Sequence, residues 1–221
     1  MFQSVGRQFG HPRGVLGRLV GRVMARGNGD FNLWIVDQIS QLQADGLGRV
    51  VELGPGPGIA LRGILHAFPQ ARVWGVDPSP EMLSQSRKHN RAETSSGRLT
   101  LLQGDVASVR ELAPVDLVLA THVLYFWHEP AAELKQLHGF LRPGGRLALG
   151  YQVRRHMPSM AQKTFPKEGH LLYDADDQVA SLLHAAGFKD VSFRVKGDTD
   201  APGGSIGIRH GVTRPAGLHP P

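Results

Sequence analysis

Four short runs of the chain are almost entirely apolar, and longer helix-like stretches separate them. The runs are VVEL at 50–53, VWGV at 73–76, LVLA at 117–120 and LALG at 147–150. A strand without alternation of apolar and polar residues is covered on both faces, as in a parallel sheet. Parallel strands joined by helices require crossover connections, which are right-handed. The pattern therefore predicts a doubly wound α/β fold.

The expected fold is a Rossmann-like, seven-stranded, mostly parallel sheet with helices on both faces. We predict strands over Arg49–Leu53, Arg72–Asp77, Leu99–Gln103, Val115–Ala120, Arg146–Gly150, Val191–Val195 and Ser205–Arg209. We predict helices over Ile59–Ala67, Ser79–Asn90, Ala131–Phe140 and Ala175–Ala186. The last two strands have no helix between them, so we expect a C-terminal antiparallel hairpin at one edge.

The 221 residues suffice for one substantial domain with lead-in and tail segments. We expect a helical lead-in or cap over residues 1–48 and the Rossmann-like domain over 49–212. We expect residues 151–173 to form a lid-like insert in that domain. Residues 213–221 are rich in proline and glycine, so we expect a disordered tail there.

The composition excludes several classes of function. The chain has no cysteine, so disulfides, thiolate nucleophiles and cysteine-based metal sites are excluded. No apolar run approaches the ~20 residues of a membrane-spanning helix. The sequence MFQS at the start leads into no apolar segment, so no signal peptide is expected and a cytoplasmic location is predicted.

The net charge of +6 is concentrated at the two ends of the chain, while residues 31–188 are neutral. A nucleic-acid-binding domain normally carries its positive charge on the working surface, so this balance argues against nucleic acid as partner. Near the N-terminus, Arg18, Arg22 and Arg26 share one face of a predicted basic amphipathic helix. One interpretation is a solvated face packed on the domain; the other is peripheral contact of residues 15–26 with an anionic membrane.

A turn with glycine at every second position follows the first predicted strand and reads ELGPGPG over residues 52–58. The dinucleotide-binding pattern G-x-G-x-x-G would need a glycine in place of Ile59, and no Gly-Lys-Ser/Thr sequence completes a triphosphate-binding loop. Pro55 and Pro57 remove two N–H donors, which suits a ligand without a phosphate chain. The Glu52 carboxylate would attract an amine.

Two further carboxylates fall at predicted strand ends. Asp77 ends the second strand, where an acidic residue grips the hydroxyls of a ribose. The alternative is that Asp77 caps the next helix, a task for which Ser79 and Pro80 are already suited. Asp105 follows the third strand and either accepts a hydrogen bond from an exocyclic amine or serves as a turn residue.

Five segments, taken in order, resemble the class I S-adenosylmethionine-dependent methyltransferases, of the small-molecule type related to ubiquinone and menaquinone methyltransferases. They are ELGPGPG at 52–58, VWGVDPSPEML at 73–83, GDV at 104–106, VDLVLATHVLYFW at 115–127 and LRPGGRLAL at 141–149. The resemblance implies transfer of the methyl group of S-adenosylmethionine to a small molecule, with S-adenosylhomocysteine as product.

The resemblance also implies roles for individual residues. Glu52 and the glycine turn would face the methionine part of the cofactor, Asp77 the ribose, and Asp105 the adenine amine. The N-terminal segment 27–39 resembles a subset of the family and adds Asn32, for which a helix cap is the alternative. The implied cofactor-binding residues are Glu52, Gly54, Gly56, Gly58, Asp77, Pro78, Ser79, Met82, Asp105, Val106, Thr121 and Asn32.

Methyl transfer from a sulfonium needs alignment and exclusion of water, and it needs a base when the acceptor must lose a proton. The candidates for such catalysis are His122, Tyr125 and His128, all after the fourth strand. The alternative for His122 is a neutral residue that shapes the pocket. The two histidines lack the helical spacing of metal ligands, so no metal site is expected.

Aromatic residues near the expected site favour an apolar or aromatic acceptor, with ordinary core packing as the alternative. They are Phe31, Tyr125, Phe126, Trp127 and Tyr151. The rival functions are a methyltransferase directed at RNA or another macromolecule through the basic N-terminal helix, a cofactor-binding protein without catalysis, and a dehydrogenase. The sequence THVL at 121–124 differs from the N/D-P-P-Y/F tetrapeptide of DNA amine methyltransferases, and the glycine spacing disfavours a dehydrogenase. The oligomeric state is left open.

Overall fold

The computed structural model describes residues 29–41 and 46–196, and the backbone of residues 205–209. The predicted amphipathic helix over residues 15–26 and the predicted tail over residues 213–221 lie outside these residues. Of the predicted helical lead-in, residues 29–41 and 46–48 are described; residues 29–41 are helical, and residues 46–48 are not.

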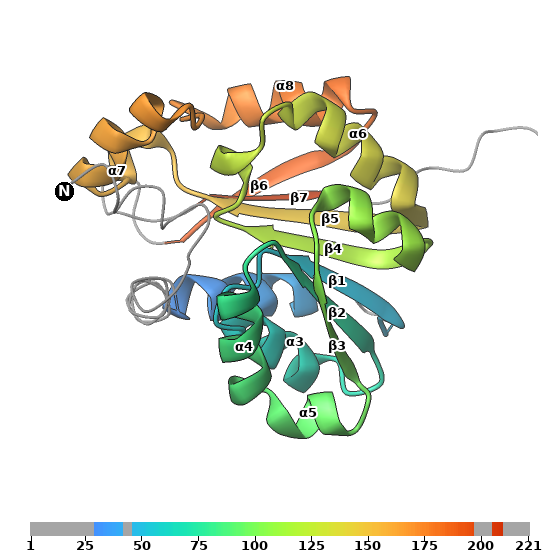
Figure 1. Ribbon diagram of the computed structural model, residues 1–221. Helices are drawn as coiled ribbons and strands as arrows, with labels where there is room; N and C mark the ends of the chain where they lie inside the picture. The colour runs from blue at the N-terminus through green and yellow to red at the C-terminus, as the bar shows by residue number, and fades with distance from the viewer. Residues whose placement is uncertain (1–28, 42–45, 197–204, 210–221) are drawn as a thin grey trace, which may run out of the picture.

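The strands form one mixed sheet with the order β3-β2-β1-β4-β5-β7-β6 (Figure 1). The strands are β1 (Arg49–Leu53), β2 (Arg72–Asp77), β3 (Leu99–Gln103), β4 (Val115–Thr121), β5 (Leu141–Tyr151), β6 (Val191–Val195) and β7 (Ser205–Arg209). β1 to β5 pair in parallel, and β7 pairs antiparallel with both β5 and β6. The predicted doubly wound, mostly parallel architecture is confirmed.

Helices connect the strands, and short helical turns lie in the loops. The α-helices are α3 (Ile59–Ala67), α4 (Pro80–His89), α5 (Arg91–Ser95), α6 (Pro130–Phe140), α7 (Ser159–Thr164) and α8 (Asp176–Ala185). The 3₁₀ turns are η1 (Val106–Leu112), η2 (Leu124–Phe126), η3 (Arg154–His156) and η4 (Pro166–Glu168). The sequence did not predict α5 or α7, because both are shorter than two turns and carry no periodic apolar pattern.

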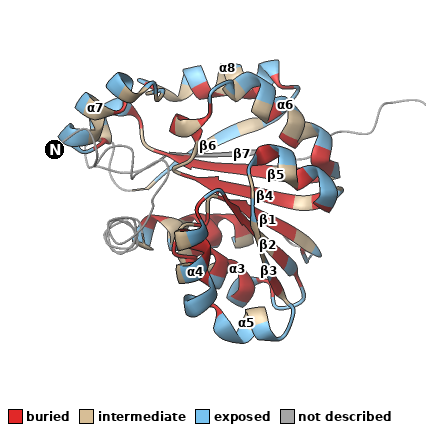
Figure 2. Cartoon of the chain, viewed as in Figure 1, coloured by how far each residue is buried: buried red, intermediate tan, exposed pale blue. Residues whose placement is uncertain are grey.

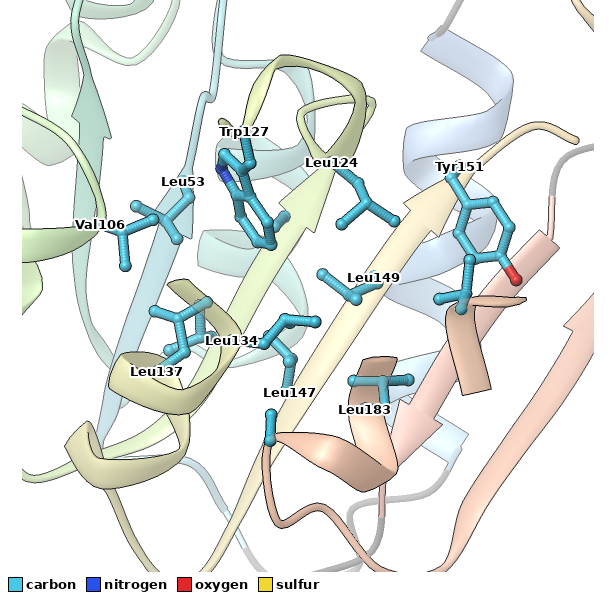
Figure 3. Packing of buried hydrophobic residues seen from close by; sticks show 14 of the residues in the cluster. Leu53, Val106, Leu124, Trp127, Leu134, Leu137, Leu147, Leu149, Tyr151 and Leu183 are labelled. Carbon is cyan, nitrogen blue, oxygen red and sulfur yellow. The ribbon is translucent and has the colours of Figure 1, made fainter. Parts of the chain in front are cut away.

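The sheet has an apolar layer on each face, which explains the near-continuous apolar strands. Val50 points to the layer that contains α3 and the helix at 29–41, and its neighbour Val51 points to the layer of α6, α8 and η1. Figure 2 shows the central strands as buried along much of their length. In Figure 3, Leu134 and Leu137 of α6 lie over Leu147 of β5. Successive strand residues therefore fill opposite cores.

The chain reverses its direction of winding between β1 and β4. β2 and β3 follow on one side of β1, whereas β4 and β5 follow on the other. Loops that leave the carboxyl ends of β1 and β4 therefore diverge and leave a crevice at this edge of the sheet.

Candidate functional site

A cavity of about 340 Å³ lies beyond the carboxyl ends of β1, β2 and β4, at the crevice where the winding reverses. It is lined by Asn32, Glu52, Leu53, Gly54, Pro55, Gly56, Pro57, Ile59, Val76, Asp77, Pro78, Met82, Gly104, Asp105, Val106, Thr121, His122, Val123, Phe126, Trp127, His128 and Glu133. These residues come from strand ends, from the loops after them and from four α-helices (the helix at 29–41, α3, α4 and α6), so the sheet topology assembles the site.

The glycine turn forms one wall of the cavity and needs glycine for steric reasons. Gly54 and Gly56 have φ values of 63° and 52°, in the left-handed region that side chains disfavour. A Cβ on Gly54 would lie 2.3 Å from Cγ1 of Val123. The Gly54 N–H donates to the Val76 carbonyl at 2.8 Å, which fixes the turn to the end of β2. The backbone of the turn is therefore open to close approach by a ligand.

Asp77 joins the glycine turn to the start of α4. Its carboxylate accepts hydrogen bonds from the Gly56 N–H at 3.1 Å and from the Ser79 N–H at 2.8 Å. Burial raises the pKa of Asp77 to about 6, although these two backbone hydrogen bonds act to lower it. The carboxylate is 5% exposed and lines the cavity, so it is held rigidly at the ligand side.

Glu52 has a buried carboxyl group, and one of its oxygens accepts no hydrogen bond. The side chain is 1% exposed, and its Oε2 has no hydrogen-bond partner. Burial, with a smaller contribution from Asp77, raises the pKa of Glu52 to about 8, and a hydrogen bond from the Leu61 backbone opposes the shift. A buried acceptor without a donor is costly, so a ligand that brings a positively charged donor would be stabilised here.

One part of the cavity, called the far end below, has an apolar wall and two carboxyl groups. It is lined by Asp105, Val106, Trp127 and Glu133. Val106 and Trp127 are 5% and 9% exposed and lie near Leu53 (Figure 3). Asp105 is exposed and caps η1: its Oδ1 accepts from the Ala107 N–H at 3.0 Å and from the backbone and side chain of Ser108. A ligand with a flat apolar group and a polar edge would suit this lining, with the flat group on the apolar wall and the edge toward the carboxyl groups.

His122 lines the cavity directly after β4, in a conformation that few residues other than glycine adopt. Its φ is 57°, and its N–H donates to the Gly150 carbonyl at 2.7 Å. The imidazole lies between the rings of Phe31 and Tyr125, with centroids 5.1 Å and 6.3 Å away. Burial lowers the pKa of His122 to about 4, so the ring is neutral near pH 7.

Comparison with known proteins agrees with this geometry. The family described as "Methyltransferase domain" matches residues 51–147, which run from β1 into β5 and contain the glycine turn, Asp77 and Asp105. The match covers less than half of the 221 residues, and it supports the predicted resemblance to class I S-adenosylmethionine-dependent methyltransferases.

Two curated relatives of this chain differ in the share of their own length that is matched. Trans-aconitate 2-methyltransferase of Azoarcus sp. (strain BH72) is 36% identical over 113 residues, which are 51% of this chain and 42% of the relative. The chain therefore spans less than half the length of that enzyme. The uncharacterized methyltransferase YdaC of Bacillus subtilis (strain 168) is 25% identical over 180 residues, 80% of this chain and 90% of the relative.

A solved structure supports the methyltransferase fold. An O-methyltransferase family protein from Burkholderia thailandensis superposes with a TM-score of 0.69 over 88% of this chain and 59% of its own, at 18% identity. At this identity the similarity shows the fold alone.

Most of the residues predicted for the methyltransferase site line the cavity. They are Asn32, Glu52, Gly54, Gly56, Asp77, Pro78, Met82, Asp105, Val106, Thr121, His122 and His128. Gly58 does not line it, because Gly58 packs on α4, where a Cβ would lie 2.4 Å from the Ser86 hydroxyl. Ser79 does not line it either, because its hydroxyl caps α4 by accepting from the Met82 N–H.

Tyr125, predicted as a catalytic candidate, lies outside the cavity. The side chain is 2% exposed, and its hydroxyl donates to the Gln152 carbonyl at 3.2 Å and accepts from the Gln152 N–H. The hydroxyl is thus used to join η2 to the end of β5. The neighbouring Phe126 lines the cavity instead, because successive residues of a helical turn point in different directions.

Glu133 is a cavity residue that the sequence did not indicate. It lies in the first turn of α6, next to the core residue Leu134. No spacing from the strand motifs identifies it, because α6 reaches the site by packing beside η1. Its position after Pro130, at the start of a helix that follows β4, is the available clue.

Among the described residues, no group of three His, Asp or Glu side chains could hold a metal ion. No helix in the described part of the chain is long and apolar enough to cross a membrane.

Proposed function

We propose that the chain transfers the methyl group of S-adenosylmethionine to a small, apolar or aromatic acceptor and releases S-adenosylhomocysteine. The observation that carries the proposal is the pair of buried carboxyl groups, Glu52 and Asp77, on either side of a glycine turn that is open to the cavity. A ligand with an amine and a ribose, and without phosphates, satisfies both groups.

The residues present fit this cofactor at three places. The Glu52 Oε2 has no partner and would bind the amine of the methionine part. Each oxygen of Asp77 accepts one backbone hydrogen bond and retains a lone pair for a ribose hydroxyl. The Val106 and Trp127 side chains offer an apolar wall to the adenine ring.

When bound, the cofactor supplies a methyl group that is already activated for displacement. The protein then has to align the acceptor and keep water out. At the His122 end, the Thr121 Oγ1 and the Asn32 Oδ1 are buried without partners, so they are available to orient polar atoms of the ligands.

His122 is suited to accept a hydrogen bond from the acceptor. Its imidazole is neutral near pH 7 because burial depresses its pKa, and a neutral ring has a free nitrogen lone pair. The rings of Phe31 and Tyr125 hold it in place. The arrangement would fit an acceptor hydroxyl that donates a hydrogen bond to the neutral ring of His122.

The insert over residues 151–173 would cover the acceptor side. The Leu171 N–H donates to the Tyr125 carbonyl at 2.9 Å, which joins the insert to the loop after β4. The rings of Phe165 and His170 pack on Phe126, with centroids 5.4 Å and 4.8 Å away, and Phe126 lines the cavity. The insert therefore supports the aromatic wall that an apolar acceptor would contact.

Calorimetric titration with S-adenosylhomocysteine tests the proposal. We expect the wild-type protein to bind, and Asp77→Ala to bind at least about tenfold more weakly, because charge-assisted hydrogen bonds to the ribose are lost. Asp177→Ala, at an exposed position in the first turn of α8, removes the same charge away from the cavity and should bind normally. Unchanged affinity in Asp77→Ala would contradict the ribose assignment.

A further inference from the structure

The carboxyl group of Glu133 lines the cavity and has one oxygen, Oε2, without a hydrogen-bond partner. Glu133 lines the cavity from the first turn of α6, and its Oε2 is buried with no hydrogen-bond partner. Burial raises the pKa of Glu133, whereas His128 and a hydrogen bond from the Glu129 backbone to the same carboxyl group act in the opposite direction. An unpaired buried acceptor is unfavourable, so the position is better suited to the ligand-bound protein than to the empty one.

Glu133 shares the far end of the cavity with Asp105. The negative charge of Asp105 contributes to the raised pKa of Glu133, as does that of Glu129, so these acidic groups lie near one another. Two neighbouring carboxyl groups at one end of a cavity favour a ligand edge that donates hydrogen bonds. Val106 directly follows Asp105 and lines the same cavity as Trp127, so an apolar surface suited to a flat ligand group adjoins the carboxyl groups.

Asp105 already uses one carboxylate oxygen for hydrogen bonds within the protein, whereas Glu133 has a buried oxygen that is unused. Its Oδ1 already accepts from the Ala107 N–H, the Ser108 N–H and the Ser108 hydroxyl, in the cap of η1. The Oε2 of Glu133 makes no such bond to the protein. The acceptor that is both buried and free is therefore on α6 and not at the end of β3.

We propose that Glu133 is a specificity-determining residue for the nucleobase of the cofactor. Its carboxylate accepts a hydrogen bond from the exocyclic amine, so the site distinguishes a 6-amino purine from a 6-oxo purine. The inference rests on the proposed function, since it concerns the base of S-adenosylmethionine.

The test compares S-adenosylhomocysteine with S-inosylhomocysteine, whose base has an oxygen in place of the 6-amino group and a proton on the neighbouring N1. We expect the wild-type protein to prefer the adenosyl ligand by about tenfold or more in Kd, as expected for one hydrogen bond to a charged acceptor. In Glu133→Gln the preference should shrink to a few-fold or less, because the amide can donate to the 6-oxo group as well as accept from the amine. Glu129→Gln removes the same charge at an exposed position on the same helix end and should keep the preference.

The preference is a ratio within one protein, so partial unfolding of a variant does not change it. If Glu133→Gln does not fold, Glu133→Ala provides the same comparison without an amide donor. A wild-type protein that binds both ligands equally would overturn the role of Glu133, and so would loss of the preference in Asp105→Asn but not in either Glu133 variant. A wild-type protein that binds neither ligand would instead overturn the proposed function.

Discussion

Glu52 illustrates how a single buried residue links stability to binding in this protein. Its pKa is raised from 4.5 to about 8, mainly by burial. Between these two values the folded state keeps a proton that the unfolded state has lost, so the stability of the empty protein falls as the pH rises. Burial of Glu52 thus lowers the stability of the empty protein where the carboxyl group would otherwise ionise, and a bound amine would offset this loss.

This shift predicts that ligand binding releases a proton. At pH 7 the Glu52 carboxyl in the empty protein is mostly protonated, and a bound ammonium favours the charged form. We expect the protein to release about one proton per site when S-adenosylhomocysteine binds near pH 7. Calorimetry in buffers of different ionisation enthalpy measures this number. Glu52→Gln should bind more weakly and release none; the same release in this variant would show that another group titrates.

At the scale of elements, the junction between the glycine turn and α4 holds the site together. The Asn90 side chain donates to the Gly58 carbonyl at 3.1 Å, and the His89 ring lies 2.7 Å from the Pro57 carbonyl oxygen. Asp77 connects the same turn to the first turn of α4 through Gly56 and Ser79. Both ends of α4 therefore contribute to the position of the turn.

The glycines of the turn should differ in their tolerance of a side chain. Gly56→Ala meets no atom within 4 Å and should cost about 1–2 kcal/mol for the left-handed backbone alone. Gly58→Ala has the same strain at φ 86°, and its Cβ would lie 2.4 Å from the Ser86 hydroxyl and 2.6 Å from the Asn90 amide nitrogen. We expect a loss of about 3 kcal/mol or more for Gly58→Ala. Urea unfolding of the two variants measures the difference, and equal losses would contradict the packing of α4 on the turn.

At the scale of the whole molecule, the features that the sequence predicts best are the positions of the strands and the residues at their carboxyl ends. The central strands β1, β2 and β4 have a near-continuous apolar pattern, and the predicted ends of β1 to β4 agree with the observed ends to within a residue. Residues at the tips of these strands, such as Glu52, Asp77 and Thr121, reach the cavity because parallel carboxyl ends share one edge. β5 is longer than predicted, because Leu141 pairs with Val115 across a register shift.

The remaining site residues depend on packing that no local pattern encodes. Glu133 reaches the cavity because α6 packs beside η1, and the orientation of η2 decides that Phe126 rather than Tyr125 faces the ligand. The role of Gly58 in the contact with α4 likewise depends on a helix that follows more than twenty residues later. These features follow from tertiary contacts, which the sequence specifies only through the complete fold.

The most direct test of the central claim is a crystal structure of the protein with S-adenosylhomocysteine bound. We predict that the ligand occupies the cavity at the ends of β1, β2 and β4. Its amine should contact Glu52, its ribose hydroxyls Asp77 and its adenine the Val106 and Trp127 wall. A ligand bound elsewhere, or one whose ribose makes no hydrogen bond to Asp77, would contradict the account.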